Sequence, residues 1–448
     1  MQFDEIAGFI KDELKKVDVT DYEIFYLESD DMTIELKDAK VDSLIKATDI
    51  SLSLRVLNDD RIGFSYCTKM TKDGLARMVA AAHQTSLNTK ADECNVIQER
   101  NYESLSVLTD YDNRIDMISF DEKVDSLKEL ESAAYGHDER VKSARQLEFR
   151  QSDKNIRLVN SNGIDCAHKK TIFSYAAVVA ATEGEETEIS WDTDFSNFYD
   201  RLDPAAIGKS AAEKAVKSLN GRVIASEKLP VILDRMVASE LLSVLAPSFF
   251  ADYVMKQKSA LIGKIGQKIL SENITILDDP LYDGGIATFP FDAEGSASEA
   301  TSVVENGVLK SYLSDSYTSK KMGIKNTANS VKGSLFAPPI VGNTNFYIMP
   351  GEKSPDQLIS DMGRGLVITE AMGLHTANPI SGDFSIGISG FFVEGGVVSF
   401  PVRGLVFSGN LYDILNDVVD IANDLKFYDK SASPSLLIKS ASIAGKQA

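Results

Sequence analysis

Histidine and cysteine, the side chains that most often bind metals or act as nucleophiles, are few in this sequence and lie far apart. The chain has four histidines and three cysteines. No two histidines lie within five residues of each other, which excludes the HExxH and HxH spacings of local zinc sites. The cysteines are odd in number and lack CxxC spacing, which argues against a disulfide framework and a cysteine zinc knuckle. These residues are His83, His137, His168, His375, Cys67, Cys94 and Cys166.

Three local patterns come closer to an active site, and each favours a structural role. Cys166 and His168 alternate on one expected strand face, where a pair two residues apart is more often packing than a catalytic dyad. The Gly-Ile-Ser-Gly stretch at 387–390 lacks the spacing of a GxSxG nucleophile motif. His375 lies in a glycine-rich stretch, and both a loop-packing role and a ligand contact stay open for it.

A dense group of carboxylates in the second half of the chain is a candidate for metal chemistry. Carboxylates with a free edge can hold Mg²⁺ or Ca²⁺, or share a proton. The same segments contain Asp-Asp-Pro and Asp-Gly-Gly, which are turn sequences in which aspartate caps nearby N–H groups. Both interpretations stay open, and the turn interpretation is favoured. The group comprises Asp278, Asp279, Asp292, Glu294, Glu299 and Glu305.

Composition and charge exclude several classes of function. The chain has 448 residues, enough for about three domains. Its 47 basic and 67 acidic residues give a net charge of −20, which repels phosphate backbones, and no long basic run offsets it. We therefore expect no direct nucleic-acid partner. No apolar stretch is long enough to span a membrane, and the N-terminal residues do not resemble a signal peptide, so we expect a cytoplasmic protein.

The first 110 residues predict an α+β unit. Apolar spacing indicates an amphipathic helix over 2–17 and a second helix near 75–82. Between them, short strands are expected at 22–27, 32–36 and 50–56. A polar connector of about 88–114 then leads to the next unit.

Residues 111–225 predict a second α+β unit. A helix with apolar residues at 124–130 precedes a hairpin formed by 156–159 and 166–179, joined at Asn162-Gly163, a dipeptide that tolerates positive φ angles. Asp203-Pro204 then indicates an N-cap and first helical residue.

The last segment, 226–448, contains eleven of the twelve prolines and predicts a large, mostly antiparallel β domain. A strand at 231–233 leads into a helix that is expected to stop or kink at Pro247. The fold class is therefore α+β. Further strands are expected at 274–277, 303–312, 345–349, 366–370, 384–393, 397–402 and 404–408.

Many short motifs along this last segment together resemble the TldD/PmbA family. The Asn-Ser-Asn-Gly hairpin at 160–163 and the chain length also agree, so the resemblance covers nearly the whole sequence. The motifs are Asp278-Asp279-Pro280, Gly284-Gly285, Phe291-Asp292, Glu294-Gly295, 304–310 (VENGVLK), Tyr312-Leu313, Asp315, Tyr317, Arg364-Gly365-Leu366, Thr369-Glu370, 382–385 (GDFS), Gly390-Phe391, Glu394, Pro401-Val402 and Gly409-Asn410-Leu411.

The resemblance implies a cytosolic zinc metallopeptidase built from two related subunits. Such enzymes cut peptides and small unfolded proteins and mature peptide-toxin precursors. The catalytic subunit, TldD, carries HExxxH on the helix that opens the C-terminal domain, and a Cys near its C-terminus completes the zinc site. The other subunit, TldE or PmbA, lacks these ligands.

This chain resembles the TldE/PmbA subunit. Gap-free matching places the HExxxH window over 243–248, and a second register that matches the acid begins at Ser239-Glu240; neither contains a His. The segment 426–430, which corresponds to the cysteine region, has no Cys. A catalytic zinc needs three protein ligands and an open position. We therefore predict no catalytic or metal-binding residue in this chain, and zinc only in a TldD-like partner subunit.

Other functions stay open. The chain could be a stand-alone homodimeric peptide-binding or regulatory protein, or a hydrolase that uses the acidic group with another metal. The name "modulator of DNA gyrase", which the family also carries, conflicts with the acidic charge unless the effect is indirect. The expected binding partners are a catalytic homologue, a second copy of the chain, and extended peptides that pair with strand edges.

Overall fold

One long, curved antiparallel sheet forms the first half of the protein. The computed structural model describes residues 1–334 and 336–446. The strand order is β3-β2-β1-β4-β5-β6, and every neighbouring pair except β1–β4 is joined by a hairpin. The segments expected as separate strands at 22–27 and 32–36 form a single strand. The strands are β1 (Asp21–Lys37), β2 (Lys40–Asn58), β3 (Arg61–Cys67), β4 (Val141–Asn160), β5 (Asp165–Glu183) and β6 (Glu186–Ser196).

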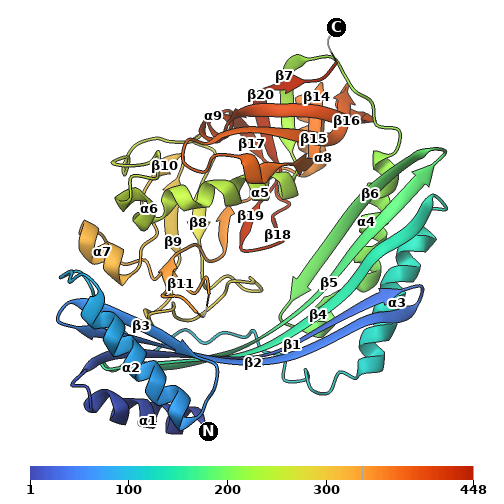
Figure 1. Cartoon of the computed structure of the whole chain (residues 1–448). Helices are drawn as coiled ribbons and strands as arrows, with labels where there is room; N and C mark the ends of the chain where they lie inside the picture. Colours follow the sequence, from blue (N-terminus) through green and yellow to red (C-terminus); the bar gives the residue numbers. More distant parts are fainter. Residues whose placement is uncertain (335, 447–448) are drawn as a thin grey trace.

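Four amphipathic helices cover the convex face of this sheet, as Figure 1 shows. Helices α1 (Phe3–Lys15) and α2 (Lys72–Asn88) share a core with one end of the sheet. Helices α3 (Phe120–His137) and α4 (Pro204–Ser218) share a second core with the other end. A short 3-10 turn, η1 (Tyr199–Arg201), precedes α4. The predicted helices are confirmed, including the N-cap at Asp203, whose side chain accepts a hydrogen bond from Ala206 N at 2.9 Å.

The β4–β5 connection forms at the predicted dipeptide but differs in detail from a two-residue turn. Its loop spans the four residues between Asn160 and Asp165, and only Gly163 has a positive φ, at 86°. The Asn160 side chain holds the loop, because its Oδ1 accepts from Asn162 N at 2.9 Å and from Ile164 N at 3.1 Å. A two-residue type I′ turn would need positive φ at both of its central residues. In this longer loop the Asn160 side chain closes the turn instead, so one positive φ is enough.

The C-terminal segment contains two six-stranded sheets, ordered β10-β9-β8-β13-β19-β18 and β16-β15-β14-β7-β20-β17, and a β11–β12 pair. The pairs are mostly antiparallel, but β13–β19 and β14–β7 are parallel. The strands after 410 were not predicted. The bounds are β7 (Glu227–Leu233), β8 (Ile276–Asp278), β9 (Thr301–Glu305), β10 (Val308–Leu309), β11 (Ser330–Val331), β12 (Ile340–Val341), β13 (Phe346–Ile348), β14 (Gly365–Met372), β15 (Asp383–Glu394), β16 (Val397–Asn410), β17 (Val418–Ile421), β18 (Lys426–Phe427), β19 (Ser431–Ser433) and β20 (Leu436–Ala444).

Helix α5 (Arg235–Leu245) shares one large hydrophobic core with both of these sheets. It ends before Pro247, as expected, and continues as the 3-10 turn η2 (Ala246–Phe249). Proline stops the helix because it has no N–H to donate. The remaining helical elements are short: α6 (Ala251–Met255), α7 (Ser316–Met322), α8 (Pro355–Met362), η3 (Leu374–Thr376) and α9 (Leu411–Asn416).

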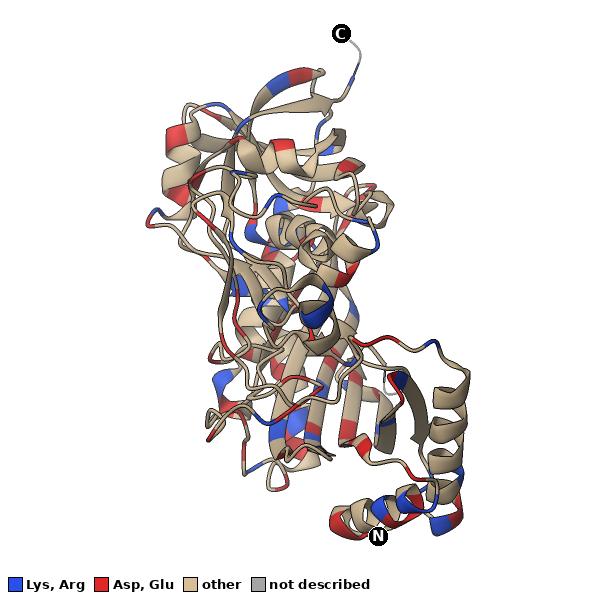
Figure 2. Cartoon of the chain, turned by 90° about the vertical axis from the view of Figure 1, so that its left-hand side faces the viewer, with Lys and Arg blue, Asp and Glu red and all other residues tan. Residues whose placement is uncertain are grey.

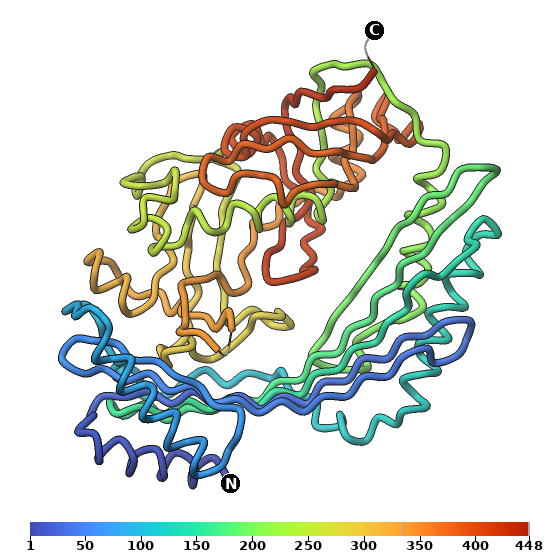
Figure 3. Tube along the Cα trace, in the orientation of Figure 1, coloured from blue at the N-terminus to red at the C-terminus, as the bar shows by residue number. Residues whose placement is uncertain are grey.

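The C-terminal segment sits in the concave face of the first sheet, and Figure 3 shows the chain passing from one body to the other. Two buried cations join them. Arg55 on β2 forms ion pairs with Glu23 at 2.7 Å and with Glu294 at 2.6 Å. Lys170 on β5 is fully buried and donates to the carbonyls of Gly285, Ile286 and Thr288 at 2.9 to 3.2 Å. These contacts hold the two bodies in register.

The proposed domain boundaries at 110 and 225 fall between elements, but the first sheet is continuous across the boundary at 110. Strands β1–β3 come from one predicted unit and β4–β6 from the next. On the side seen in Figure 2, basic and acidic residues are interspersed over both bodies. Within the described residues, no helix is long and apolar enough to cross a membrane.

Candidate functional site

The first part of the acidic group lies in buried or turn positions with hydrogen-bond donors already in place. Asp278 accepts from Asn329 Nδ2 at 2.6 Å and from Thr344 N and Oγ1 at 2.7 and 2.8 Å. Burial raises the pKa of Asp278 to about 6. Asp279 Oδ1 accepts from Leu281 N at 2.9 Å within a turn. Asp279 therefore fits the turn interpretation, whereas Asp278 is held by buried contacts to residues distant in the sequence.

The second part of the group is also engaged. Asp292 Oδ1 accepts from Glu294 N and Ser296 N, both at 2.9 Å. Burial, followed by the Glu294 charge, raises the pKa of Asp292 well above its usual range. Glu294 binds Arg55 through Oε1 and accepts from Ser316 N at 3.0 Å through Oε2. Asp292 therefore holds main-chain N–H groups within the C-terminal segment, and Glu294 joins the two bodies through Arg55.

The outer two members of the group lie in surface ion pairs. Glu299 pairs with Lys325 at 2.5 Å, and Glu305 pairs with Lys310 at 3.1 Å. In the part of the chain that the structure describes, no three His, Cys, Asp or Glu side chains lie close enough to share a metal ion. The six acids are thus engaged in turns, in buried hydrogen bonds and in ion pairs.

Helix α5 carries both windows aligned with the zinc motif. The window 243–248 runs out of α5 into η2, where Ser248 is fully buried and donates to Pro379 O at 2.9 Å. The second window begins at Ser239, whose Oγ accepts from Ser433 N at 2.8 Å. The hydroxyls of Ser239 and Ser248 are thus used within the fold, Ser243 is exposed, and neither window contains an imidazole. The donor set therefore does not fit a zinc ion.

The segment aligned with the family's cysteine lies beside the start of α5. Tyr428 OH accepts a hydrogen bond from Arg235 Nε at 3.2 Å. Burial raises the pKa of Tyr428 to about 12, although the nearby Arg235 opposes this shift. A neutral phenol that accepts a hydrogen bond from a guanidinium thus lies in this segment.

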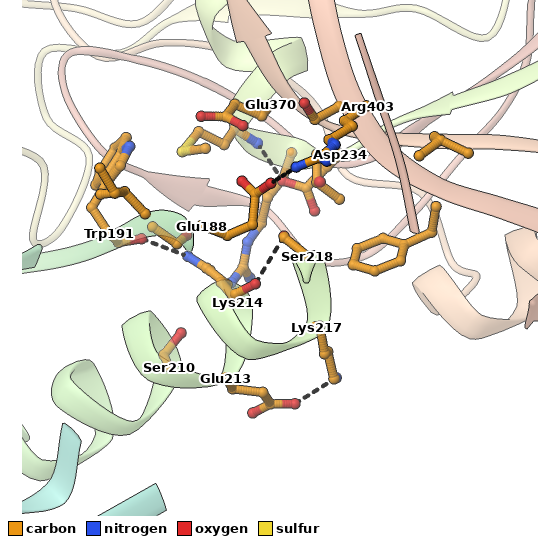
Figure 4. A pocket seen from close by; sticks show the side chains of 18 of the residues that line it. Glu188, Trp191, Ser210, Glu213, Lys214, Lys217, Ser218, Asp234, Glu370 and Arg403 are labelled. Atoms are coloured by element: carbon orange, nitrogen blue, oxygen red, sulfur yellow. Dashed lines mark hydrogen bonds and ion pairs between the residues drawn. The ribbon is translucent and has the colours of Figure 1, made fainter. Parts of the chain in front are cut away.

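Arg235 and Tyr428 also line a cleft between the central and C-terminal segments, which Figure 4 shows from close by. Its volume is about 310 Å³. One wall is formed by β6 and α4, and the other by the start of α5 together with β14, β15 and β16. The lining residues are Glu188, Ile189, Ser190, Trp191, Ser210, Glu213, Lys214, Lys217, Ser218, Asp234, Arg235, Met236, Thr369, Glu370, Ser389, Phe391, Val402, Arg403 and Tyr428.

The basic side chains of the cleft have partners, whereas three acids in or beside it have no ion pair among the described residues. Burial raises the pKa of Asp234, and partial burial with the Glu188 charge raises that of Glu370. Burial, then the Glu370 charge, raises the pKa of Glu240 on α5 to about 7. The pairs are Lys214–Asp192 at 3.2 Å, Lys217–Glu213 at 2.5 Å, Arg403–Glu186 at 2.6 Å and Arg403–Glu188 at 2.8 Å.

Strand β6 presents its outer edge to the cleft. The sheet ends at β6, so the main-chain groups along this edge have no strand partner in the described structure. Lys214 donates to Trp191 O at 3.4 Å, and Lys426 donates to Thr193 O at 3.3 Å. Alternate residues of a strand point to the same edge, so Ile189 also faces outward. Part of the edge is covered by lysines and part is open.

The histidines and cysteines singled out from the sequence do not meet in this cleft. His168 Nε2 lies 3.0 Å from Asp110 Oδ2, in a contact beside Phe289. Cys166 is buried in an apolar cluster, and burial raises the pKa of its thiol to about 12. His375 is exposed in η3.

Sequence reasoning missed the cleft itself. Trp191 and Glu370 come from strands more than 170 residues apart in the chain, so no spacing could join them. Trp191 was nevertheless detectable as the only tryptophan in the sequence. Glu370 was part of the family motif but carried no predicted role.

Family models cover most of the chain in three consecutive pieces. They describe a PmbA/TldA metallopeptidase domain 1 at 22–86, a central domain at 113–219 and a C-terminal domain at 226–445. An uncharacterized protein of Methanocaldococcus jannaschii is 31% identical over 422 residues, which is 93% of this chain and 95% of the relative. The metalloprotease PmbA of Escherichia coli O157:H7 is 27% identical over 93% of this chain and 90% of its own length.

Solved structures share the fold along the whole chain. A crystal structure of a putative modulator of a DNA gyrase from Thermotoga maritima has a TM-score of 0.91 and 28% identity, and the match covers 99% of this chain and 100% of that one. The TldE structure from Thermococcus kodakarensis has a TM-score of 0.87 at 21% identity, with 98% and 100% covered. These matches confirm the α+β fold class and the resemblance seen in the sequence. The chain belongs to the PmbA/TldD metallopeptidase family.

Proposed function

We propose that this chain is the metal-free, non-catalytic subunit of a cytoplasmic two-subunit zinc metallopeptidase. The proposal rests on the residues of helix α5 and of the turn that follows it. Neither alignment of the family's zinc motif places an imidazole there, and Ser239 and Ser248 already hydrogen-bond within the fold. Zinc and the cleavage step then belong to a TldD-like partner. The substrates expected for the complex are peptides and small unfolded proteins, including peptide-toxin precursors.

The role proposed for this chain is to hold an extended peptide near the partner's active site. An extended peptide can add to an exposed strand edge through main-chain hydrogen bonds. The outer edge of β6 at Ile189 is such an edge, and it lies on the wall of the cleft. Trp191 and Tyr428, which pack edge to face at 6.3 Å between ring centroids, offer apolar surface beside it.

Affinity capture tests the subunit assignment. The tagged full-length chain is purified from a native lysate of its own organism, and captured proteins are identified by mass spectrometry. We expect a stoichiometric homologue that carries HExxxH, and zinc and peptidase activity only in the complex. Recovery of the chain alone, or as a homodimer without such a homologue in the genome, would favour the stand-alone regulatory function instead.

Peptide binding to the β6 edge has its own test. Ile189→Pro removes an outward-facing N–H in the cleft, and Thr187→Pro removes one on the same edge outside the lining residues. Edge strands tolerate proline where the N–H faces solvent. Binding of an unfolded casein fragment, followed by the fluorescence of Trp191, should weaken about tenfold in the first variant and stay unchanged in the second. Equal affinity in both variants would contradict the proposed peptide path.

A further inference from the structure

Arg235 is the one basic side chain lining the cleft that has no ion pair among the described residues. Its contacts are instead with uncharged oxygens: Nε donates to Tyr428 OH at 3.2 Å, and Nη1 donates to the main-chain carbonyl of Asp424 at 3.5 Å. A guanidinium that is partly withdrawn from water is best stabilised by a carboxylate. The basic lining residues that do have an ion pair are Lys214, Lys217 and Arg403.

The Arg235 guanidinium still has donors to offer. It carries five N–H groups in one plane, and the phenol and the carbonyl use one each. Nη2 has no hydrogen-bond partner among the described residues, and it is not one of the unpartnered polar atoms that the fold encloses. Nη2 is therefore open to solvent, on a residue that lines the cleft. The bonds to Tyr428 and Asp424 fix the plane of the group before a ligand arrives.

The carboxylates beside Arg235 have other hydrogen-bond donors. Asp234 Oδ1 accepts from Met236 N at 3.0 Å as the N-cap of α5. The Asp424 carboxylate accepts from Ser435 N and Ser435 Oγ, both at 2.8 Å. Four basic and four acidic residues line the cleft, so it lacks the net negative charge of the whole chain. A carboxylate from a ligand can therefore approach Arg235.

The open part of the β6 edge ends beside Arg235. Beyond Ile189, lysine side chains cover the next two outward carbonyls of the strand. Tyr428, which accepts from Arg235, packs edge to face on Trp191 at 6.3 Å between ring centroids. A peptide that pairs with the edge at Ile189 thus meets a covered edge at Trp191, where its chain has to end or turn away. The covered carbonyls are those of Trp191, bound by Lys214, and of Thr193, bound by Lys426.

We propose that Arg235 binds the C-terminal carboxylate of a peptide that lies along β6 in the cleft. This inference rests on the proposed peptide-binding role of the chain and adds that the ligand is a free peptide end. A guanidinium can donate to both oxygens of a carboxylate, and partial burial strengthens such a charge-assisted contact. Tyr428 acts as a positioning residue, because its hydroxyl holds Nε of Arg235.

Matched peptides test the inference on the isolated full-length chain. Two short apolar peptides, both N-acetylated, differ only in having a free C-terminal carboxylate or a C-terminal amide, and the fluorescence of Trp191 follows binding at neutral pH. The wild-type chain should bind the acid about tenfold more tightly than the amide. In Arg235→Met this preference should vanish while the affinity for the amide stays unchanged. Lys217→Met also removes one positive charge from the cleft lining and should keep the preference.

Arg235→Gln provides a second variant with a more conservative change. Glutamine keeps an N–H donor for Tyr428 but has no charge, so it too should bind acid and amide equally. Unchanged affinity for the amide in either variant shows that the cleft is intact. A preference for the acid that survives in both variants would overturn the inference.

Two further results separate this inference from the proposed peptide path. Equal affinity of the wild-type chain for acid and amide would overturn the carboxylate site and leave the path along β6 standing. Failure of the wild-type chain to bind either peptide would overturn both. A third peptide, N-acetylated and amidated with an internal glutamate, offers a side-chain carboxylate instead. If it binds as tightly as the acid and depends on Arg235, the assignment to the C-terminus is wrong.

Discussion

Replacing Arg55 with methionine should destabilise the protein more than any other single loss of charge in the described interface between its two bodies. The Arg55 side chain is 10% exposed, and its partners Glu23 and Glu294 are 3% and 2% exposed. Methionine keeps an unbranched, flexible side chain and removes both ion pairs. Two buried carboxylates then lack their shared counter-charge.

The expected cost is about 3–5 kcal/mol, the range found when one partner of a buried ion pair is removed. Arg403→Met provides the matched control. Arg403 also joins two carboxylates between the same two bodies, Glu186 and Glu188, but it is 41% exposed. A pair in that setting contributes about 0–1 kcal/mol.

The effect of Arg55→Met should also grow with pH. Burial raises the pKa of Glu23 even though Arg55 opposes the shift. A carboxyl group whose folded pKa lies above its unfolded value contributes stability below the unfolded pKa, near 4.5, and loses it as pH rises through the folded pKa. Without Arg55 the folded pKa rises further. The variant should therefore be closer to wild type at pH 5 than at pH 8.

Urea denaturation measures these differences with two probes. Far-UV circular dichroism follows the sheets, and the fluorescence of Trp191, the only tryptophan, follows the cleft between the bodies. In Arg55→Met the fluorescence transition should shift to lower urea at least as much as the dichroism transition. A loss below about 1 kcal/mol, or one equal to that of Arg403→Met, would refute the reasoning.

Three further predictions concern Lys170, Glu240 and the zinc-motif window at 243–248. Lys170→Met should lower the free energy of unfolding by about 3 kcal/mol in urea denaturation. Burial lowers the pKa of Lys170 to about 8. The wild-type protein should therefore become more stable as the pH rises from 8 to 10.5, and the variant should lack this increase. Glu240→Gln should stabilise the protein by about 1–3 kcal/mol at pH 8 and little at pH 4, since ionisation near pH 7 opposes burial. Ser243→His with Ser248→His should bind zinc weakly in calorimetry and give no peptidase activity, because Ser248 is fully buried; nanomolar affinity with activity would contradict the subunit assignment.

Much of the fold was predictable from local signals. Amphipathic spacing located α1, the Asp203-Pro204 dipeptide marked the start of α4, and Pro247 marked the end of α5. The full length of β1 and β2 could not be predicted from the sequence. Charged residues at positions such as Asp30 and Asp31 interrupt the apolar alternation, although the backbone continues in the sheet there. Strand β20 contains Lys439, Ser440 and Ser442 and is held by pairing with β7, which no local pattern reveals.

The site was predictable only in part. The absence of His and Cys from the aligned windows could be read directly from the sequence. The cleft could not, because its walls come from elements that only the tertiary fold brings together. The acidic group was a metal candidate because its members are close in sequence. In the fold, backbone N–H groups bind Asp292 and Arg55 binds Glu294, so these carboxylates have different partners.

The central claim is that this chain contributes no zinc ligand and no cleavage of its own. Metal content and casein hydrolysis, measured on one dialysed sample of the isolated full-length chain, test it most directly. We predict far less than one equivalent of zinc and no hydrolysis above the buffer control. Zinc near one equivalent together with EDTA-sensitive hydrolysis would contradict the account.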